Sequence, residues 1–498
     1  EELQRAQTKI NAQTVRGLEQ IGGFGGKAVT LAQGQLYAGD PGFYKTRLGW
    51  INQATADDVR QISQQWLGKG RYKLEVFPFG EHQTVASTVD RSKGLPAVGT
   101  MPDLVFPEVQ RAMLDNGMSV VLAERDSIPV VNITLQFDAG YAADMFGKLG
   151  TASFTLAMLD EGTKSRSALE ISAEAEALGA NITTGSNLDM SSASLSALTT
   201  NLKPSLDLFA EVVREPAFDD EEIKRLRQRW LANIEQEKNQ PVQLALRNLP
   251  PLIYGKDHAY GMPLTGSGTV DSITSITRDD LVNFHQTWLR PSNGTVFVVG
   301  NTTMDEILPQ LNRAFGKWKE NRMATPAKNL ADVAGADQGS VFIIDKPGAP
   351  QSLILAGHVA PPTGVDNNMD ISAANEVIGG AFTARLNMNL REDKGWAYGA
   401  GSFLPDARGQ RAWMTYAPVQ TDRTSDSIKE LKREYDEYLG TRPATQDELN
   451  KTVRNNVNSL PGQYETSNAV MGALLSNNRF GRPDDYVSTL KSQYESIN

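Results

Sequence analysis

One stretch of this sequence occurs twice, and the repeat limits the possible folds more than any other feature. Residues 55–67 read TADDVRQISQQWL, and residues 277–289 read TRDDLVNFHQTWL. Each stretch begins with a threonine, a favoured N-cap residue, and places two acidic residues in the first helical turn. Each is followed by a β-rich run, RYKLEVFPFG or GTVFVVGN. The spacing of 222 residues (277 − 55) predicts a domain of about 220 residues that is used repeatedly.

A second pair of similar segments lies twice as far apart. EELQRAQTKINAQ at residue 1 resembles DELNKTVRNNVNS at residue 447, a spacing of 446 residues (447 − 1). We therefore predict three parts: residues 1–90 as the C-terminal part of a preceding domain, residues 100–322 as a complete domain, and residues 338–498 as a second domain truncated at its C-terminus. The chain begins within a helical pattern, so we also expect it to be a piece of a longer protein.

The complete domain shows a mixed pattern of strands and helices. Asn116-Gly117, between two apolar runs, is typical of a β-hairpin turn. Helical patterns follow at about 150–160 and 167–180, then a β-pair at 180–199 and a long charged helix at 219–238. This order predicts the α+β class, in which each repeated domain is a mostly antiparallel sheet with helices packed on one face.

Composition narrows the classes of function. The 498 residues include no cysteine, which excludes disulfides, thiolate nucleophiles and cysteine-ligated zinc. The net charge of -10 argues against nucleic acid as a partner, and no apolar run is long enough to predict a transmembrane segment. The histidines are scattered without helical pairing, which favours packing or surface roles; they are His82, His258, His285 and His358.

Residues 150–163 read GTASFTLAMLDEGT, which is similar to a known sequence motif. It resembles G-x-A-H-F-x-E-H-M-L-F-x-G-T of the pitrilysin/insulinase superfamily of inverted zinc peptidases, in its processing-peptidase-like branch. In that family both histidines bind zinc and the glutamate is the general base. The resemblance places Ser153, Leu156 and Ala157 at these three positions. None of them carries an imidazole or a carboxylate, so we expect a degenerate site.

The third zinc ligand of the family, a glutamate, lies on the long helix that follows. The matching stretch WLANIEQEKNQP places Asn233 at that position. Glu235 and Glu237 are two and four residues further along, and helix rotation directs them elsewhere. The resemblance therefore implies that this chain binds no metal and has no catalytic residue in its own unit. Zinc is expected on an upstream or partner unit.

A different motif of the same family is retained near the end of the chain. Residues 376–403 read EVIGGAFTARLNMNLREDKGWAYGAGSF and resemble G-G-x-x-S-x-L-x-x-x-L-R-E-x-x-G-L-A-Y. In the family its arginine and tyrosine hold the substrate backbone and the oxyanion at a partner domain's zinc, and they match Arg391 and Tyr398. Both side chains donate hydrogen bonds to a carbonyl oxygen that gains charge. The residues leave another interpretation open, in which Arg391 pairs with Glu392 or Asp393 and Tyr398 is a half-buried aromatic in a strand.

These resemblances imply a function that is incomplete in this chain. We expect the non-catalytic half of a zinc metallopeptidase, inactive alone, which adds a chamber wall and the substrate-binding Arg391 and Tyr398 to peptide hydrolysis elsewhere. The expected partners are a catalytic peptidase unit and a peptide substrate, and the expected location is the periplasm or cell envelope. The alternative is a purely structural or peptide-binding subunit with no proteolytic role.

Overall fold

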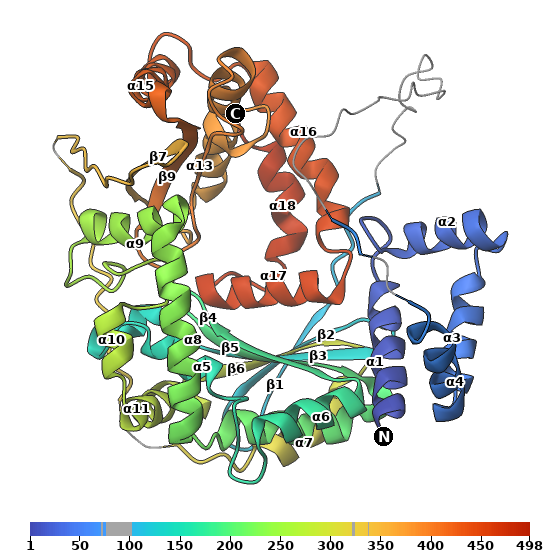
Figure 1. Cartoon of the computed structure of the whole chain (residues 1–498). Helices are drawn as coiled ribbons and strands as arrows, with labels where there is room; N and C mark the ends of the chain where they lie inside the picture. Colours follow the sequence, from blue (N-terminus) through green and yellow to red (C-terminus); the bar gives the residue numbers. More distant parts are fainter. Residues whose placement is uncertain (71–72, 76–101, 321–323, 337) are drawn as a thin grey trace. The chain divides into compact units, whose positions relative to one another are not determined.

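The computed structural model describes residues 1–70, 73–75, 102–320, 324–336 and 338–498 (Figure 1). The chain forms two compact units, Glu1–Asp103 and Leu104–Asn498. Each unit has its own arrangement of elements. Within the second unit we distinguish a first lobe, residues 104–320, and a second lobe, residues 338–498.

The first unit, in its described part, is helical. Its helices are α1 (Glu2–Gly17), α2 (Lys27–Ala38), α3 (Phe43–Gln53) and α4 (Ala56–Leu67). The helix α4 begins at the predicted N-cap, because the Thr55 hydroxyl accepts from the Asp58 backbone N–H and the Asp58 carboxylate accepts from the Thr55 N–H. The β-rich run predicted after α4 lies mostly outside the described residues. The assignment of residues 1–90 to a preceding domain stays a prediction.

The first lobe is built on a six-stranded sheet of order β1-β2-β6-β3-β5-β4. The strands are β1 (Val109–Met113), β2 (Ser119–Glu124), β3 (Val130–Phe137), β4 (Asn181–Ser186), β5 (Ser191–Leu198) and β6 (Gly294–Gly300). The predicted hairpin joins β1 to β2, and Gly117 has a φ of 86°, which glycine adopts without strain. The β2–β6 pair is parallel and the other four pairs are antiparallel, which confirms the predicted mostly antiparallel sheet.

The helices of the first lobe include the four that the sequence predicts, at about 150–160, 167–180, 219–238 and 277–289. The helices are α5 (Thr151–Ala157), α6 (Ala168–Leu178), α7 (Leu202–Arg214), α8 (Asp220–Asn239), α9 (Pro241–Tyr254), α10 (Val270–Ser275), α11 (Arg278–Trp288) and α12 (Met304–Phe315), with the short helices η1 (Tyr141–Phe146), η2 (Thr199–Asn201) and η3 (Pro291–Asn293). The helix α5 is shorter than expected, and α11 begins at its predicted Thr277 cap. No helix among the described residues has the length and apolar character needed to span a bilayer.

The second lobe repeats part of this order around a smaller sheet, β7-β9-β8, which is antiparallel throughout. Its strands are β7 (Gln351–Ala360), β8 (Gly401–Phe403) and β9 (Arg411–Gln420). Its helices are α13 (Asn368–Asn375), η4 (Glu376–Gly380), α14 (Arg385–Asn387), η5 (Met388–Asp393), η6 (Thr421–Arg423), α15 (Thr424–Leu439), α16 (Gln446–Gln463), α17 (Ser467–Phe480) and α18 (Tyr486–Glu495). From β7 to α18 the order of elements follows that from β3 to α10.

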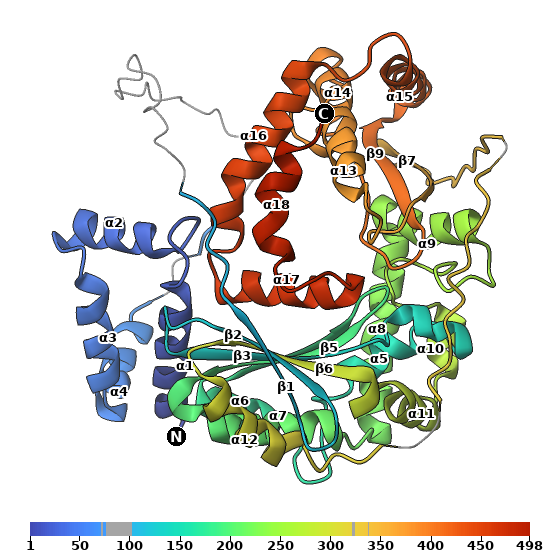
Figure 2. The ribbon, with the colours of Figure 1, turned by 180° about the vertical axis from the view of Figure 1, so that it is seen from behind.

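The two lobes exchange helices. One face of the first sheet packs on the lobe's own helices, as predicted, and the opposite face packs on α17 of the second lobe (Figure 2). There Val121 and Phe297 belong to one buried apolar cluster with Val470. In return, α9 of the first lobe lies against β7, where a Cβ at Gly357 would be 3.1 Å from a methyl carbon of Leu249. Each sheet therefore depends on a helix from the other lobe.

The buried Asp189, in the turn between β4 and β5, joins the two lobes by charge. Asp189 is 1% exposed. One oxygen accepts from the Tyr260 hydroxyl at 2.5 Å. The other accepts from Nη2 of Arg479, on α17, at 2.5 Å and from the backbone N–H of Arg408 at 3.0 Å. Because charge-assisted bonds out of water are strong, this carboxylate fixes the lobes to each other.

Candidate functional site

The helix α5 carries three of the four positions at which the family resemblance expects zinc chemistry. The buried Asp144 fixes its first turn, since its two oxygens accept from the backbone N–H groups of Gly150 at 2.7 Å and Ala152 at 2.8 Å. Burial raises the pKa of Asp144 to about 8, although the two backbone hydrogen bonds lower it. The N–H groups that helices leave unpaired are thus satisfied here by a carboxylate.

The four positions differ in burial. Ser153 and Ala157, one helical turn apart on α5, are half-buried. Leu156 is 0% exposed and belongs to the main apolar core, and Asn233 on α8 is exposed. The leucine therefore supports packing and has no access to a reacting water.

Among the residues that the structure describes, the neighbourhood of Asn233 offers no replacement ligand. The helices α5 and α8 lie side by side, with the rings of Phe154 and Trp230 5.4 Å apart. Glu235 forms an ion pair with a lysine one turn further along α8. Glu237 pairs with Nη1 of Arg247 at 2.6 Å. Both carboxylates are therefore taken by other partners, in agreement with the prediction that they are directed elsewhere.

A zinc ion does not fit the side chains at these positions. Zinc in proteins is bound by imidazole, thiolate or carboxylate groups, and a hydroxyl, two aliphatic groups and an amide supply none of them. The residues concerned are Ser153, Leu156, Ala157 and Asn233. Within the described part of the chain, no three histidine, aspartate or glutamate side chains gather in a way that could hold a metal.

Two of the histidines serve packing. His258 stacks on Tyr254 with ring centroids 5.0 Å apart, and its Nδ1 accepts from the Tyr260 N–H at 2.9 Å. The Nε2 of His285 lies 2.7 Å from the Val213 carbonyl oxygen, to which it donates. Burial lowers the pKa of both imidazoles, which keeps them neutral.

The second lobe exposes the arginine and the tyrosine of the retained motif next to each other. The guanidinium of Arg391, on η5, lies 5.1 Å from the ring centroid of Tyr398 and 4.6 Å from that of Phe382. These two aromatic residues are 84% and 65% exposed. The Nε of Arg391 pairs with Glu392 at 3.1 Å, and no described residue accepts from its other four N–H donors. We call Phe382, Arg391 and Tyr398 the aromatic-arginine stack.

The backbone under this stack is fixed by short-range contacts. The amide of Asn387 donates to the Phe382 carbonyl at 2.6 Å and accepts from the Ala400 N–H at 3.0 Å, so one side chain holds the loops on both sides of η5. Gly379 lies so close to β8 that a Cβ would be 2.6 Å from the Ser402 nitrogen. A glycine is required there, which explains part of the Gly-Gly motif.

The sequence left open that Arg391 forms an ion pair and that Tyr398 is a half-buried aromatic in a strand, and the structure shows only the first. Arg391 does pair with Glu392, but both side chains are substantially exposed, at 31% and 47%. Such surface pairs stabilise a protein by about 1 kcal/mol or less. Tyr398 is neither half-buried nor in a strand. Packing therefore does not account for the exposed tyrosine beside the arginine.

Sequence reasoning missed two residues of these sites. Phe382 occupies a variable position of the motif, and its only signal is a large apolar residue between Gly380 and the following helix. Asp144 caps α5 from six residues before Gly150, and no capping pattern has that spacing.

Two family models match the chain. The model described as Insulinase (Peptidase family M16) matches residues 119–265, and the model described as Peptidase M16 inactive domain matches residues 275–456. The chain belongs to the pitrilysin/insulinase superfamily. The first model spans the four positions on α5 and α8 described above, and the inactive-domain model spans the aromatic-arginine stack.

Relatives of this superfamily agree in sequence and fold. An uncharacterized zinc protease of Mycobacterium leprae is 26% identical over 325 residues, which cover 64% of this chain and 71% of the relative. One of Streptomyces coelicolor is 24% identical over 413 residues, covering 81% and 84%. The crystal structure of a peptidase M16 inactive domain from Pseudomonas fluorescens has a TM-score of 0.71 at 26% identity, covering 78% of this chain and 92% of that one. The periplasmic protease PqqL of Escherichia coli shares the fold, with a TM-score of 0.66 at 15% identity, over 89% of this chain and 48% of that one.

Proposed function

We propose that this chain is the non-catalytic half of an insulinase-type zinc metallopeptidase. It lines part of the peptide chamber, and Arg391 and Tyr398 contact a peptide at the zinc site of an upstream or partner unit. The observation that carries the proposal is the exposed aromatic-arginine stack, in which four guanidinium donors have no acceptor among the described residues, in the region matched by the inactive-domain model. The degenerate positions on α5 and α8 support it, because they offer no ligand for a zinc ion.

The stack is suited to binding a polarised carbonyl. Arg391 lies between two aromatic faces, so its guanidinium loses little further freedom when it donates to a ligand. The Tyr398 hydroxyl supplies one more donor for the same oxygen or for the adjoining backbone. Zinc on the other unit supplies a Lewis acid and activated water. The residues of this chain orient the peptide and stabilise the charge on its carbonyl oxygen.

The location belongs to the same proposal. A periplasmic or cell-envelope protein is compatible with a chain that contains no cysteine. Fractionation of the source cells, with cytoplasmic and periplasmic marker proteins as controls, tests this part separately from the chemistry.

The proposal that zinc and catalysis belong to another unit is tested by comparing the chain alone with the protein as it occurs in its source. We expect the purified 498-residue chain to contain no stoichiometric zinc by mass spectrometry and to leave a quenched fluorescent peptide library uncleaved. The native protein, isolated with its catalytic unit, should contain zinc and cleave the same library. Stoichiometric zinc in the chain alone overturns the proposal. A native assembly without peptidase activity identifies the chain as a structural or peptide-binding subunit instead.

The role of the stack is tested by kinetics on the active assembly. We expect Arg391→Ala to lower kcat by about 100-fold and Tyr398→Phe by about 10-fold, each with a smaller change in KM, because the donors act on developing charge. The matched control is Arg482→Ala, since Arg482 also lies over two aromatic rings, at 4.4 Å from Tyr486 and 5.1 Å from Phe480. Unchanged kinetics in Arg391→Ala would make the stack structural.

A further inference from the structure

The helical turn that carries Arg391 is wider than a turn of an α-helix. In η5 the N–H of Lys394 donates to the carbonyl of Asn389, five residues earlier, at 2.9 Å, which makes this segment a π-helical turn. Such turns are rare in proteins and are frequent at functional sites. The direction in which Arg391 leaves η5 therefore depends on the residues that hold this turn in place.

Asn389 holds the inner side of η5. It is 7% exposed, and its Nδ2 donates to Glu430 at 2.8 Å and to Glu434 at 2.7 Å. Its Oδ1 is buried and accepts from no described residue, so the two carboxylates are the hydrogen-bond partners that fix this side chain. Hydrogen bonds to an ionised acceptor are roughly twice as strong as those between neutral groups.

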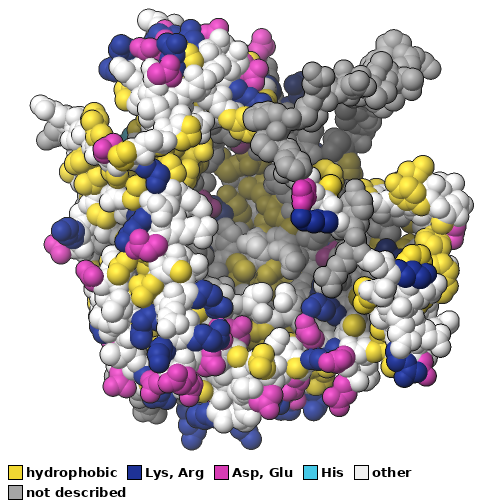
Figure 3. Space-filling model, in the orientation of Figure 1, with side chains coloured by type: hydrophobic (Ala, Val, Ile, Leu, Met, Phe, Trp, Pro, Cys, Tyr) yellow, Lys and Arg dark blue, Asp and Glu magenta, His cyan; other side chains and the backbone are white. Residues whose placement is uncertain are grey.

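Both carboxylates belong to α15. The outer face of α15 carries exposed ion pairs such as Lys432 with Asp436, and Figure 3 shows acidic and basic side chains mixed over this helix at the top of the view. Glu434, in contrast, is 4% exposed and accepts from Arg433 at 3.0 Å and from Arg442. A buried carboxylate needs such partners, because its desolvation is costly. The arginines thus hold a fixed acceptor in place for Asn389.

The same turn also places Tyr398. The carbonyl of Leu390, the residue before Arg391, accepts from the N–H of Trp396 at 2.9 Å and from that of Ala397 at 3.3 Å. Leu390 is 1% exposed and belongs to a buried apolar cluster of the second lobe. The segment that leads into Tyr398 is therefore attached to η5, and a rotation of η5 would change the position of both residues.

We propose that Asn389 is a positioning residue. Its amide, held by Glu430 and Glu434, sets the rotation of η5 and thereby the approach of Arg391 to Tyr398. Residues two positions apart leave a helix on roughly opposite sides, which is why a buried Asn389 accompanies an accessible Arg391. Its effect on catalysis rests on the proposed function, in which the stack contacts the reacting carbonyl. A misplacement of about 1 Å in such a group can cost roughly 100-fold in rate.

The geometry is tested in the intact chain by ¹⁹F NMR after incorporation of 3-fluorotyrosine. Loss of one resonance in Tyr398→Phe identifies Tyr398. The Arg391 guanidinium lies 5.1 Å from the centroid of this ring, so Arg391→Ala should shift the resonance. We expect Asn389→Leu, which keeps the size of the side chain but removes both donors, to shift it in the same direction. If Asn389→Leu does not fold, Glu430→Ala removes one of the two bonds at a partly exposed position and should produce a smaller shift in that direction.

The effect on catalysis is measured on the active assembly. We expect Asn389→Leu to lower kcat at least about 10-fold with a smaller change in KM, as for Arg391→Ala. Asn389→Asp should do the same, because it places a third carboxylate beside two others. The double variant Asn389→Asp/Glu430→Gln exchanges donor and acceptor. It should restore the parent resonance and most of kcat, which a general loss of stability would not allow.

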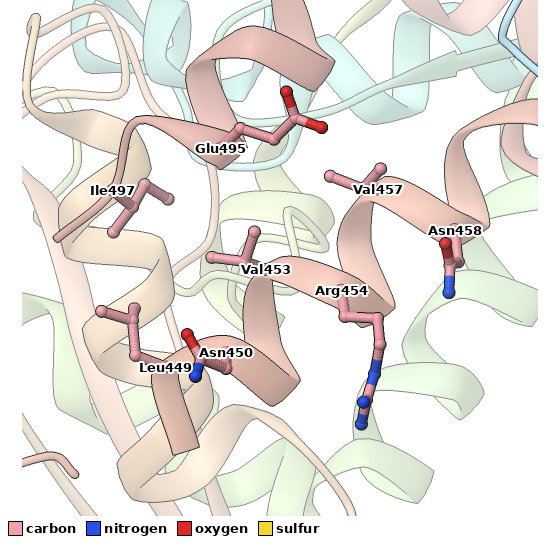
Figure 4. A pocket seen from close by; sticks show the side chains of 8 residues that line it. All are labelled: Leu449, Asn450, Val453, Arg454, Val457, Asn458, Glu495 and Ile497. Carbon is pink, nitrogen blue, oxygen red and sulfur yellow. The ribbon is translucent and has the colours of Figure 1, made fainter. Parts of the chain in front are cut away.

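Two controls carry the same substitution at other asparagines. Asn478→Leu removes a side-chain bond to Gln136 of 3.0 Å on α17. Asn458→Leu changes a residue that lines a pocket of about 320 Å³ beside α16, and none of the residues lining this pocket belongs to η5 or to the stack (Figure 4). Both controls should keep the Tyr398 resonance and kcat of the parent chain.

The outcomes separate the positioning role from the proposed function. An unshifted Tyr398 resonance in folded Asn389→Leu overturns the positioning role, whatever the activity. An unchanged kcat in Asn389→Leu also overturns it, provided that Arg391→Ala lowers kcat in the same assembly. If Arg391→Ala itself leaves kcat unchanged, the proposed function fails, and the resonance alone decides whether Asn389 positions the stack.

Discussion

The strands β3 and β7 occupy corresponding places in the two lobes but differ in how completely other residues cover them. Both pair antiparallel with the strand that precedes a short helical turn and an amphipathic helix. All eight residues of β3 are buried, whereas in β7 only Ala360, its last residue, is. The strand sequences are similarly apolar. Burial here is therefore set by the neighbours of a strand, and its own composition does not determine it.

The two lobes also differ in the apolar cores that stabilise them. The first lobe has a large continuous core that includes both its sheet and its helices. The core of the second lobe is divided into smaller clusters, around Ile378 and around Leu460. We infer that the second lobe depends on the first for part of its stability, through α9 and through Asp189.

The largest expected effect is on the contact between the lobes. Asp189→Asn removes the charge that Arg479 and Tyr260 approach, and leaves the guanidinium poorly compensated. Breaking a buried pair in this way costs about 3 to 5 kcal/mol. We expect the second lobe of the variant to unfold at a lower temperature than the first lobe, measured by calorimetry of the full chain. Asp436→Asn, in the exposed pair with Lys432, should change nothing measurable.

The next effect compares two isoleucines at matched positions, Ile133 in β3 and Ile354 in β7. Ile133 is 0% exposed, so Ile133→Ala should lower the free energy of unfolding by about 2 to 5 kcal/mol. Ile354 is only partly buried, and Ile354→Ala should cost about 1 kcal/mol. Denaturant unfolding measures both. Equal losses would mean that the second sheet is covered in solution as fully as the first.

The smallest effect depends on pH and concerns the start of α16. Arg385 donates to both oxygens of Glu448 at 2.8 and 2.6 Å, and these bonds, more than the Thr445 cap, lower the pKa of Glu448 to about 2. A carboxyl whose pKa is lower in the folded state stabilises the protein above its unfolded value and loses that contribution as pH falls. Glu448→Gln should therefore cost about 1 kcal/mol at pH 7, because the group is partly exposed.

Unfolding measured over a series of pH values distinguishes the loss of the Arg385–Glu448 pair from a general loss of stability in acid. The difference between Glu448→Gln and the parent chain should narrow as pH falls from about 4.5 toward 2. The control Glu222→Gln removes a carboxylate near the start of α8, where Arg225 is its half-exposed partner, and should show little difference at any pH. A constant difference for Glu448→Gln would assign its effect to packing.

The sequence predicted several elements of the first lobe, among them the β1–β2 hairpin and α11, because their signals are local. Thr277, Asn116-Gly117 and the apolar periods each act within a few residues. It also placed Arg391 and Tyr398 together, since a long motif fixes their register. The helix exchange could not be predicted, because Val470 shares a buried cluster with Val121, 349 residues away in the sequence (470 − 121). Phe382 was missed for a similar reason, since its contact with Arg391 depends on a loop that Asn387 holds.

The packing of α17 on the first sheet has a consequence for synthesis of the protein. The ribosome completes β6 at Gly300, but Val470, which covers that face of the sheet, emerges 170 residues later (470 − 300). At about 5 to 20 residues per second this delay is roughly 9 to 34 seconds. During that interval the nascent chain presents Val121, Ala123, Phe297 and Val299 as an uncovered apolar surface. We expect general chaperones to associate with the growing polypeptide at this stage and to leave once α17 has been made.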